Sequence, residues 1–147
     1  MPPPDPGQAL RRFLGQASPG DYVALHAYLP PSEEHDRALA SLRASIRAAT
    51  GLATTIGYGP RFLHSTGQLH KGDGGRGLFV QLVADPTEDL PIPERAGATE
   101  STLSFGVLLA AQALGDHEAL RRAGRRVVRL SLGRKSAAEI VRLGEAL

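Results

Sequence analysis

The sequence predicts an α/β fold, a three-layer αβα domain with a mainly parallel sheet of four or five strands in a doubly wound, Rossmann-like arrangement. Short apolar runs alternate along the chain with amphipathic helical segments, as in proteins built from strand–helix–strand units. The run at 21–29 is nearly continuously apolar, which is typical of a parallel strand buried on both faces. A chain of 147 residues, 41% hydrophobic, is sufficient for one domain with its own core.

The first third of the chain predicts a helix, a strand and a second helix. Residues 1–7 are rich in proline and are expected to be a disordered stub, so that the single domain covers 8–147. Leu10, Phe13 and Leu14 have the spacing of a short amphipathic helix over 7–17. After the strand at 21–29, Ser32 is a suitable N-cap for a helix that runs to about Ala49 and stops at Gly51.

The remaining chain continues the alternation. The predicted strands are 52–59, 77–85 and 125–132, and the predicted helices are 60–71, 101–114, a short one after Asp116, and a closing one from Ser136. The helix at 101–114 is apolar almost all round, which predicts a central place in the packing, and Gly115 is expected to break it. The connection at 86–100 is acidic, rich in proline and long, which is typical of a functional or mobile loop.

Composition excludes several classes of protein. The absence of cysteine rules out disulfides and thiolate zinc sites, and the five histidines show no metal-binding spacing, so no metal and no cofactor is predicted. Seventeen cations against fifteen carboxylates form a mixed surface that does not favour nucleic acid. No window has the length and hydrophobicity of a signal core or a membrane span, so we expect a cytoplasmic protein with no membrane partner.

The stretch GYGPRFLHSTGQLHKGDGGRG, residues 57–77, is the main candidate for a site. In a parallel sheet, ligands collect at the carboxyl ends of the strands, where four segments are predicted to converge: 30–35, 57–64, 85–95 and 132–136. Gly57 and Gly59 permit a tight turn and close approach of a ligand to the backbone. The start of a following helix presents free N–H groups to an anion such as phosphate.

A helix over 60–71 would place Arg61, His64, Gln68 and Lys71 on one face. The Arg61 guanidinium can bind a phosphate as a fork, the His64 imidazole can move protons, and the Gln68 amide can hydrogen-bond a hydroxyl. The alternative is an ordinary solvated polar face. Gly67 argues for the ligand, because a helix-interior glycine is costly unless something packs closely against it.

Other polar segments have simpler interpretations. His26, within a predicted strand, is expected to be a satisfied core histidine. Glu33, Glu34 and His35 lie at the ligand edge, although carboxylates are favoured at any helix N-terminus. The GRKS loop at 133–136 also lies at that edge, with Ser136 a possible N-cap.

GYGPRFLHSTGQLHKG together with FGVLLAAQALGDHEAL resembles the C-terminal isomerase portion of bifunctional transaldolase/glucose-6-phosphate isomerase proteins and, more distantly, the second sugar-isomerase (SIS) domain of phosphoglucose isomerases. The likeness runs from about Gly20 to Gly133. STGQ, at 65–68, is similar to the family's Thr-Asn-Gly-Gln helix start. The resemblance implies an SIS-type fold and aldose–ketose isomerisation of a sugar phosphate through an enediol.

Two departures from the family limit the expected activity. The family's glutamate base near this turn has no counterpart in 57–72, and its Ser/Thr-rich phosphate loop belongs to a first SIS domain that this sequence lacks. We therefore expect half of an isomerase site, inactive without a partner: a first SIS domain, a transaldolase domain or a second copy. A non-catalytic sugar-phosphate-binding or assembly module is the alternative. The predicted catalytic residues are His64 and Lys71, and the predicted substrate-binding residues are Gly57, Gly59, Arg61, Ser65, Thr66 and Gln68.

Overall fold

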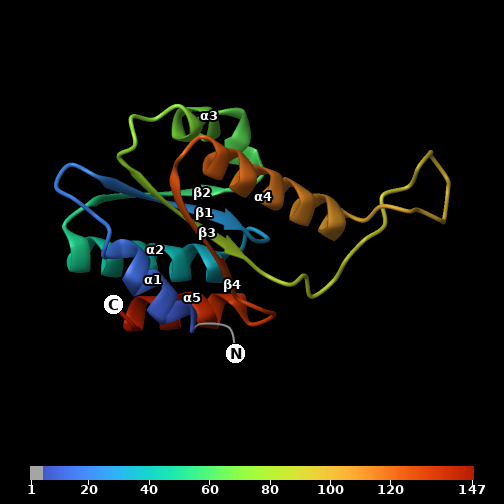
Figure 1. Ribbon diagram of the computed structural model, residues 1–147. Coiled ribbons are helices and arrows are strands. Elements are labelled where there is room, and N and C mark those ends of the chain that lie inside the picture. The colour runs from blue at the N-terminus through green and yellow to red at the C-terminus, as the bar shows by residue number, and fades with distance from the viewer. Residues whose placement is uncertain (1–4) are drawn as a thin grey trace.

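A sheet of four parallel strands forms the centre of the computed structural model, which describes residues 5–147 (Figure 1). Its strands are β1 (Tyr22–Tyr28), β2 (Ala53–Tyr58), β3 (Gly77–Val83) and β4 (Arg126–Ser131), in the order β2-β1-β3-β4. The predicted α/β class and parallel sheet are confirmed. Because the chain leaves β1 in one direction and β3 in the other, the strand order reverses between these two strands, which is where ligands bind in doubly wound folds.

Helices cover both faces of the sheet, which gives the three predicted layers (Figure 1). One face carries α1 (Pro6–Leu14), α2 (Glu33–Thr50) and α5 (Ser136–Glu145). The other carries a 3₁₀ turn, η1 (Arg61–His64), with α3 (Thr66–Lys71) and α4 (Phe105–Arg122). No helix in the described chain is both long enough and apolar enough to cross a membrane.

The main core lies between the sheet and the layer of α1, α2 and α5. It is built from fully buried aliphatic side chains that the sequence pattern anticipates, among them Leu10, Leu25, Leu42, Val80 and Ile140. The second helix has the predicted ends: the Ser32 hydroxyl accepts a hydrogen bond from the His35 N–H, and Gly51 has a φ of 71° as a left-handed C-cap.

The first helix begins earlier than predicted. It starts at Pro6, and the carboxylate of Asp5 accepts a hydrogen bond from the Gln8 N–H as an N-cap. Part of the predicted stub is therefore helical, because Asp-Pro supplies both a cap and a residue suited to the first helical position. Residues 1–4 of that stub lie outside the described chain.

The predicted helix over 60–71 is wrong as one continuous element. It is divided at Ser65, whose backbone (φ −140°, ψ −97°) separates η1 from the short α3. The four polar residues Arg61, His64, Gln68 and Lys71 therefore do not share one helical face. Gly67 lies in the tight junction, where an added Cβ would come within 3.2 Å of the Leu63 side chain and the Phe62 carbonyl oxygen, so the close packing it indicated is internal.

The fourth helix differs from its prediction in two respects. It runs unbroken from Phe105 to Arg122 through Gly115, and Ser104 caps it by accepting a hydrogen bond from the Val107 N–H. It is also not central, since Val107 and Leu114 are 56% and 51% exposed. Ala113 and Leu120 of this helix are fully buried, but the apolar residues on its other side form an uncovered surface.

The long connection between β3 and α4 forms an arm that projects from the body beyond the start of α4 (Figure 1). The Ile92 N–H donates to the Leu103 carbonyl at 2.8 Å, and Pro91 and Ser104 form an antiparallel bridge. Leu90 and Leu103, near the base of this arm, are exposed apolar residues.

Candidate functional site: a crevice at the carboxyl edge of the sheet

A crevice of about 590 Å³ opens at the carboxyl ends of β1, β3 and β4, between α4 and the N-terminus of α5. Tyr28, Val83 and Ser131 form its floor at the strand ends, and Leu109 and Ala113 of α4 form one wall. The opposite side consists of the start of α2, the loop after β3 and the loop at 134–136. The crevice thus occupies the position at which the strand order of the fold predicts a ligand.

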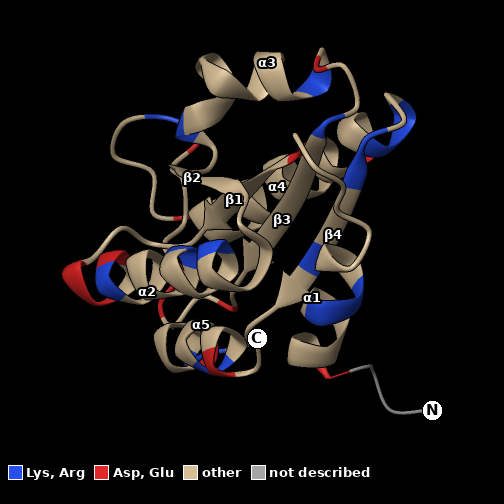
Figure 2. Ribbon diagram, turned by 90° about the vertical axis from the view of Figure 1, so that its left-hand side faces the viewer, with Lys and Arg blue, Asp and Glu red and all other residues tan. Residues whose placement is uncertain are grey.

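Three cations line the crevice: Arg129 at the end of β4, and Arg134 and Lys135 in the loop before α5. All three are exposed, and none of their side chains forms an ion pair or hydrogen bond with any described residue. Figure 2 shows other cations spread over α1, α2, α5, β4 and the end of α3. Three cations around one cavity, against the two carboxylates Glu34 and Asp85, leave the crevice net positive and favour a negatively charged ligand.

The first turn of α5 adds hydrogen-bond donors to the same wall. The N–H groups of Ser136, Ala137 and Ala138 donate no hydrogen bond within the described chain, and the N-cap residue Lys135 offers no side-chain acceptor. Free N–H groups at the positive end of a helix dipole bind phosphate or carboxylate oxygens. Two carboxylates, Glu34 and Asp85, also line the crevice.

His35 connects the starts of α2 and α5. Its Nε2 lies 2.8 Å from the Ser136 Oγ, and its Nδ1 lies 2.9 Å from the Ser32 Oγ. Ser136 is buried and His35 is partly buried, and both line the crevice, whereas Ser32 is exposed outside it.

A polar network lies between the sheet and α4, next to the crevice. Asp116 of α4 is fully buried; its carboxylate lies 3.7 Å from the Nδ1 of His26 and 3.4 Å from the Nζ of Lys71. The Nε2 of His26 lies 3.0 Å from the Nδ1 of His70. Burial alone would raise the pKa of Asp116, but His26 and Lys71 outweigh it and hold that pKa below its ordinary value.

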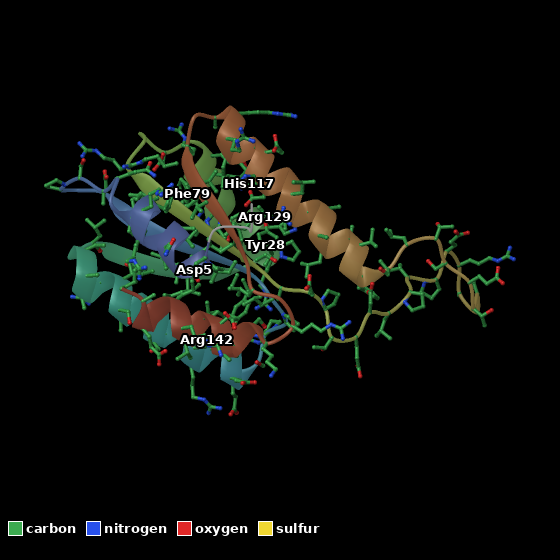
Figure 3. The ribbon with its side chains drawn as sticks, turned by 60° about the horizontal axis from the view of Figure 1, so that its bottom comes forward. Asp5, Tyr28, Phe79, His117, Arg129 and Arg142 are labelled. Atoms are coloured by element: carbon green, nitrogen blue, oxygen red, sulfur yellow. The ribbon has the colours of Figure 1, made fainter. Side chains whose placement is uncertain are left out.

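Tyr28 links this network to the crevice. It is 2% exposed, and its hydroxyl has no hydrogen-bond partner among the described residues. Burial, and then the nearby Asp116 carboxylate, raises the pKa of Tyr28. Figure 3 shows Tyr28, Arg129 and His117 grouped beside α4, well away from Arg142 on α5. An unpartnered buried hydroxyl at the wall of a cavity is available to a ligand or to water.

The predicted site residues lie elsewhere. None of the eight lines the crevice. Arg61, His64, Ser65, Thr66 and Gln68 are exposed on η1 and α3. Gly57 and Lys71 are partly buried and Gly59 is buried, and Lys71 pairs with Asp116 rather than facing the crevice.

The two glycines of the motif accommodate aromatic rings of the protein. A Cβ on Gly57 would lie 3.2 Å from the Phe62 side chain, and a Cβ on Gly59 would lie 2.6 Å from the Tyr28 ring. The Gly-x-Gly-Pro turn predicted that a ligand approaches the backbone closely. The groups that approach it are instead the side chains of Phe62 and Tyr28.

Gly59→Ala is expected to destabilise the protein by about 1–3 kcal/mol, because the buried Tyr28 ring must move to admit the methyl group. Chemical denaturation monitored by circular dichroism measures the change. Gly115→Ala is the control, since no atom lies within 4 Å of its added Cβ, and it should be neutral or slightly stabilising. Equal stability of Gly59→Ala and the wild type would contradict this packing.

The sequence identified only part of the crevice. The segments 30–35, 85–95 and 132–136 were predicted at this edge and all contribute residues to it, among them Glu34, His35, Asp85, Lys135 and Ser136. Arg129 and the α4 wall were missed. Arg129 occupies the same register row as Gln81 and His26, both of which face α4, and a single sequence does not reveal this register.

Comparison with known proteins adds the fold alone. No family model matches the chain, and no curated protein matches it. Among solved structures, the hypothetical protein TT0462 from Thermus thermophilus is similar, with a TM-score of 0.64 and 22% sequence identity. The match covers 95% of this chain and 37% of that one, so the chain spans little more than a third of its structural neighbour. The α/β architecture is thus one that a solved protein also adopts.

Proposed function

We propose that this chain binds a sugar phosphate in the crevice at the carboxyl edge, as one half of an aldose–ketose isomerase site. The observation that carries the proposal is the group of unpaired cations, Arg129, Arg134 and Lys135, beside the free N–H groups at the start of α5. A phosphate needs both charge and directed donors, and the two occur together here. The Tyr28 hydroxyl and the carboxylates of the crevice suit the hydroxyls of a sugar.

The proposal that the crevice is half of a site rests on the apolar side chains that are exposed beside it. The first turn of α4 exposes Phe105, Val107 and Leu108, and the neighbouring arm exposes Leu90 and Leu103. The two segments adjoin, since the Phe105 N–H donates to the Leu90 carbonyl, and exposed apolar side chains gathered in this way are typical of a contact with another protein surface. Because α4 also forms a wall of the crevice, a partner seated on it would close the same cavity. The resemblance to the isomerase portion of two-domain enzymes supports the same arrangement.

The position of the phosphate subsite is tested by removing cations either from the crevice or from η1. Titration calorimetry with fructose 6-phosphate should show at least tenfold weaker binding in an Arg134→Ala/Lys135→Ala variant, since each charge-assisted hydrogen bond contributes about 1.5–3 kcal/mol. Arg122→Ala, an exposed cation at the far end of α4, is the matched control. Loss of binding in Arg61→Ala but not in the double variant would move the subsite to η1 and refute this assignment.

Isomerisation by the isolated chain is expected to stay at background level. Moving a proton between C1 and C2 requires a base within hydrogen-bond reach and stabilisation of the enediolate. Glu34, His35 and Asp85 are the groups of the crevice that can accept a proton, but its α4 side is open. A coupled assay should register turnover of glucose 6-phosphate only when a first SIS domain is added. Robust turnover by the pure chain would refute the half-site proposal while leaving sugar-phosphate binding intact.

A further inference from the structure

We propose that Ser136 is a nucleophile activated by His35, which gives the crevice an acyl-transfer activity toward small carboxylic esters. The proposal goes beyond sugar-phosphate binding and does not depend on it. It rests on the Ser136–His35–Ser32 chain of hydrogen bonds, on the cavity into which Ser136 opens, and on the unused backbone donors that follow it.

The hydrogen bonds fit a serine and its general base. The 2.8 Å separation of the Ser136 Oγ and the His35 Nε2 lies within the range for a nucleophile and its base. The Ser32 Oγ already accepts a hydrogen bond from the His35 backbone N–H at 3.1 Å, and its second lone pair can accept one from Nδ1. With the proton held on Nδ1, Nε2 is free to accept the proton of Ser136. Ser32 thus acts as a positioning residue.

The surroundings of Ser136 supply the other requirements of acyl transfer. Ser136 is the first residue of α5, follows the loop after β4 and lines the crevice. The N–H groups of Ala137 and Ala138 have no partner in the described chain and can stabilise an oxyanion. Leu109, Ala110 and Ala113 of α4 provide an apolar wall for the acyl group.

The reaction is balanced with water as the only co-reactant. The Ser136 Oγ forms a bond to the ester carbonyl carbon as its proton passes to the His35 Nε2. The bond from that carbon to the leaving oxygen then breaks, and His35 returns the proton to the departing alcohol. Water attacks the acyl-serine by the same route and releases the carboxylic acid.

Two probes test the proposal on the whole chain. A fluorophosphonate should label Ser136, located by peptide mass spectrometry, and p-nitrophenyl acetate should release a burst of about one p-nitrophenolate per chain. His35→Gln should slow both reactions at least tenfold, since general-base catalysis contributes about 10²–10⁴. His64→Gln, an exposed histidine, and Ser41→Ala, an exposed serine of α2, should change neither.

Labelling at Ser136 that depends on His35 supports the proposal. Labelling spread over several serines, labelling unaffected by His35→Gln, or none above that of the urea-unfolded protein overturns it and leaves His35 a structural link between α2 and α5. Thermal unfolding of His35→Gln and Ser136→Ala excludes loss of fold as the cause. Sugar-phosphate binding is measured separately, so either proposal can fail while the other stands.

Discussion

Asp116→Ala is expected to lower the free energy of unfolding by about 3–5 kcal/mol, because it removes the acceptor from a buried group of charged and polar side chains. Asp116 is the shared partner of His26, at 3.7 Å, and of Lys71, at 3.4 Å. Both Asp116 and His26 have side chains only 1% exposed, so water cannot replace the lost carboxylate. Urea denaturation at neutral pH measures the change.

Controls separate the charge from the packing. Asp116→Asn keeps the shape but not the charge, and should recover only part of the lost stability. Glu118→Ala, two residues along the same helix, removes a partly exposed carboxylate that pairs with Arg121 at 3.6 Å and should cost less than about 1 kcal/mol. Equal effects of Asp116→Ala and Glu118→Ala would mean that the buried network contributes nothing to stability.

The fold was predictable because its signals are local. The continuous apolar run that became β1, the Ser32 and Gly51 ends of α2, and the alternation of strands and helices each follow from a few neighbouring residues. The wrong predictions concern helices whose ends are determined by contacts with residues far away in the sequence. Gly115 does not interrupt α4, since one glycine costs a helix only about 1 kcal/mol and Asp116 is held by His26 and Lys71 from other elements. The break at Ser65 likewise accompanies the packing of Phe62 against Gly57 and Gly67.

The candidate site was partly predictable for the same reason. Strand ends can be placed from the order of elements, so the edge to which Lys135 and Ser136 belong was foreseen. Which side chains meet at that edge depends on the crossing of α4 and on the sheet register, neither of which a single sequence reveals. The glycine-rich turn was predicted to be a ligand site because a glycine indicates that another group lies close to the backbone. The sequence does not say whether that group is a ligand or a side chain of the protein. In this protein the neighbour is the Tyr28 ring.

Stability is expected to fall by about 2 kcal/mol as the pH is lowered from 6.5 toward 4, through His70. Burial and then the neighbouring His26 lower the pKa of His70 from 6.5 to about 4, although Asp116 and Asp73 oppose the shift. The unfolded chain therefore binds a proton in this range that the folded chain does not, and protonation favours unfolding. The contribution is fully present above pH 6.5 and is lost as the pH approaches 4. The full shift corresponds to about 3 kcal/mol, reduced here because the ring is partly exposed.

Comparison of variants isolates this contribution from that of the carboxylates. Asp116 and Asp73 also have lowered pKa values, so their contributions are lost only below about pH 4, outside the window used. Urea denaturation at pH 7 and at pH 4.5 should show a smaller difference for His70→Asn than for the wild type, whatever the effect of the substitution at neutral pH. His64→Asn, on the exposed side of η1, should keep the wild-type difference. If His70→Asn retains the whole wild-type loss of stability between the two pH values, a group other than His70 is responsible for that loss.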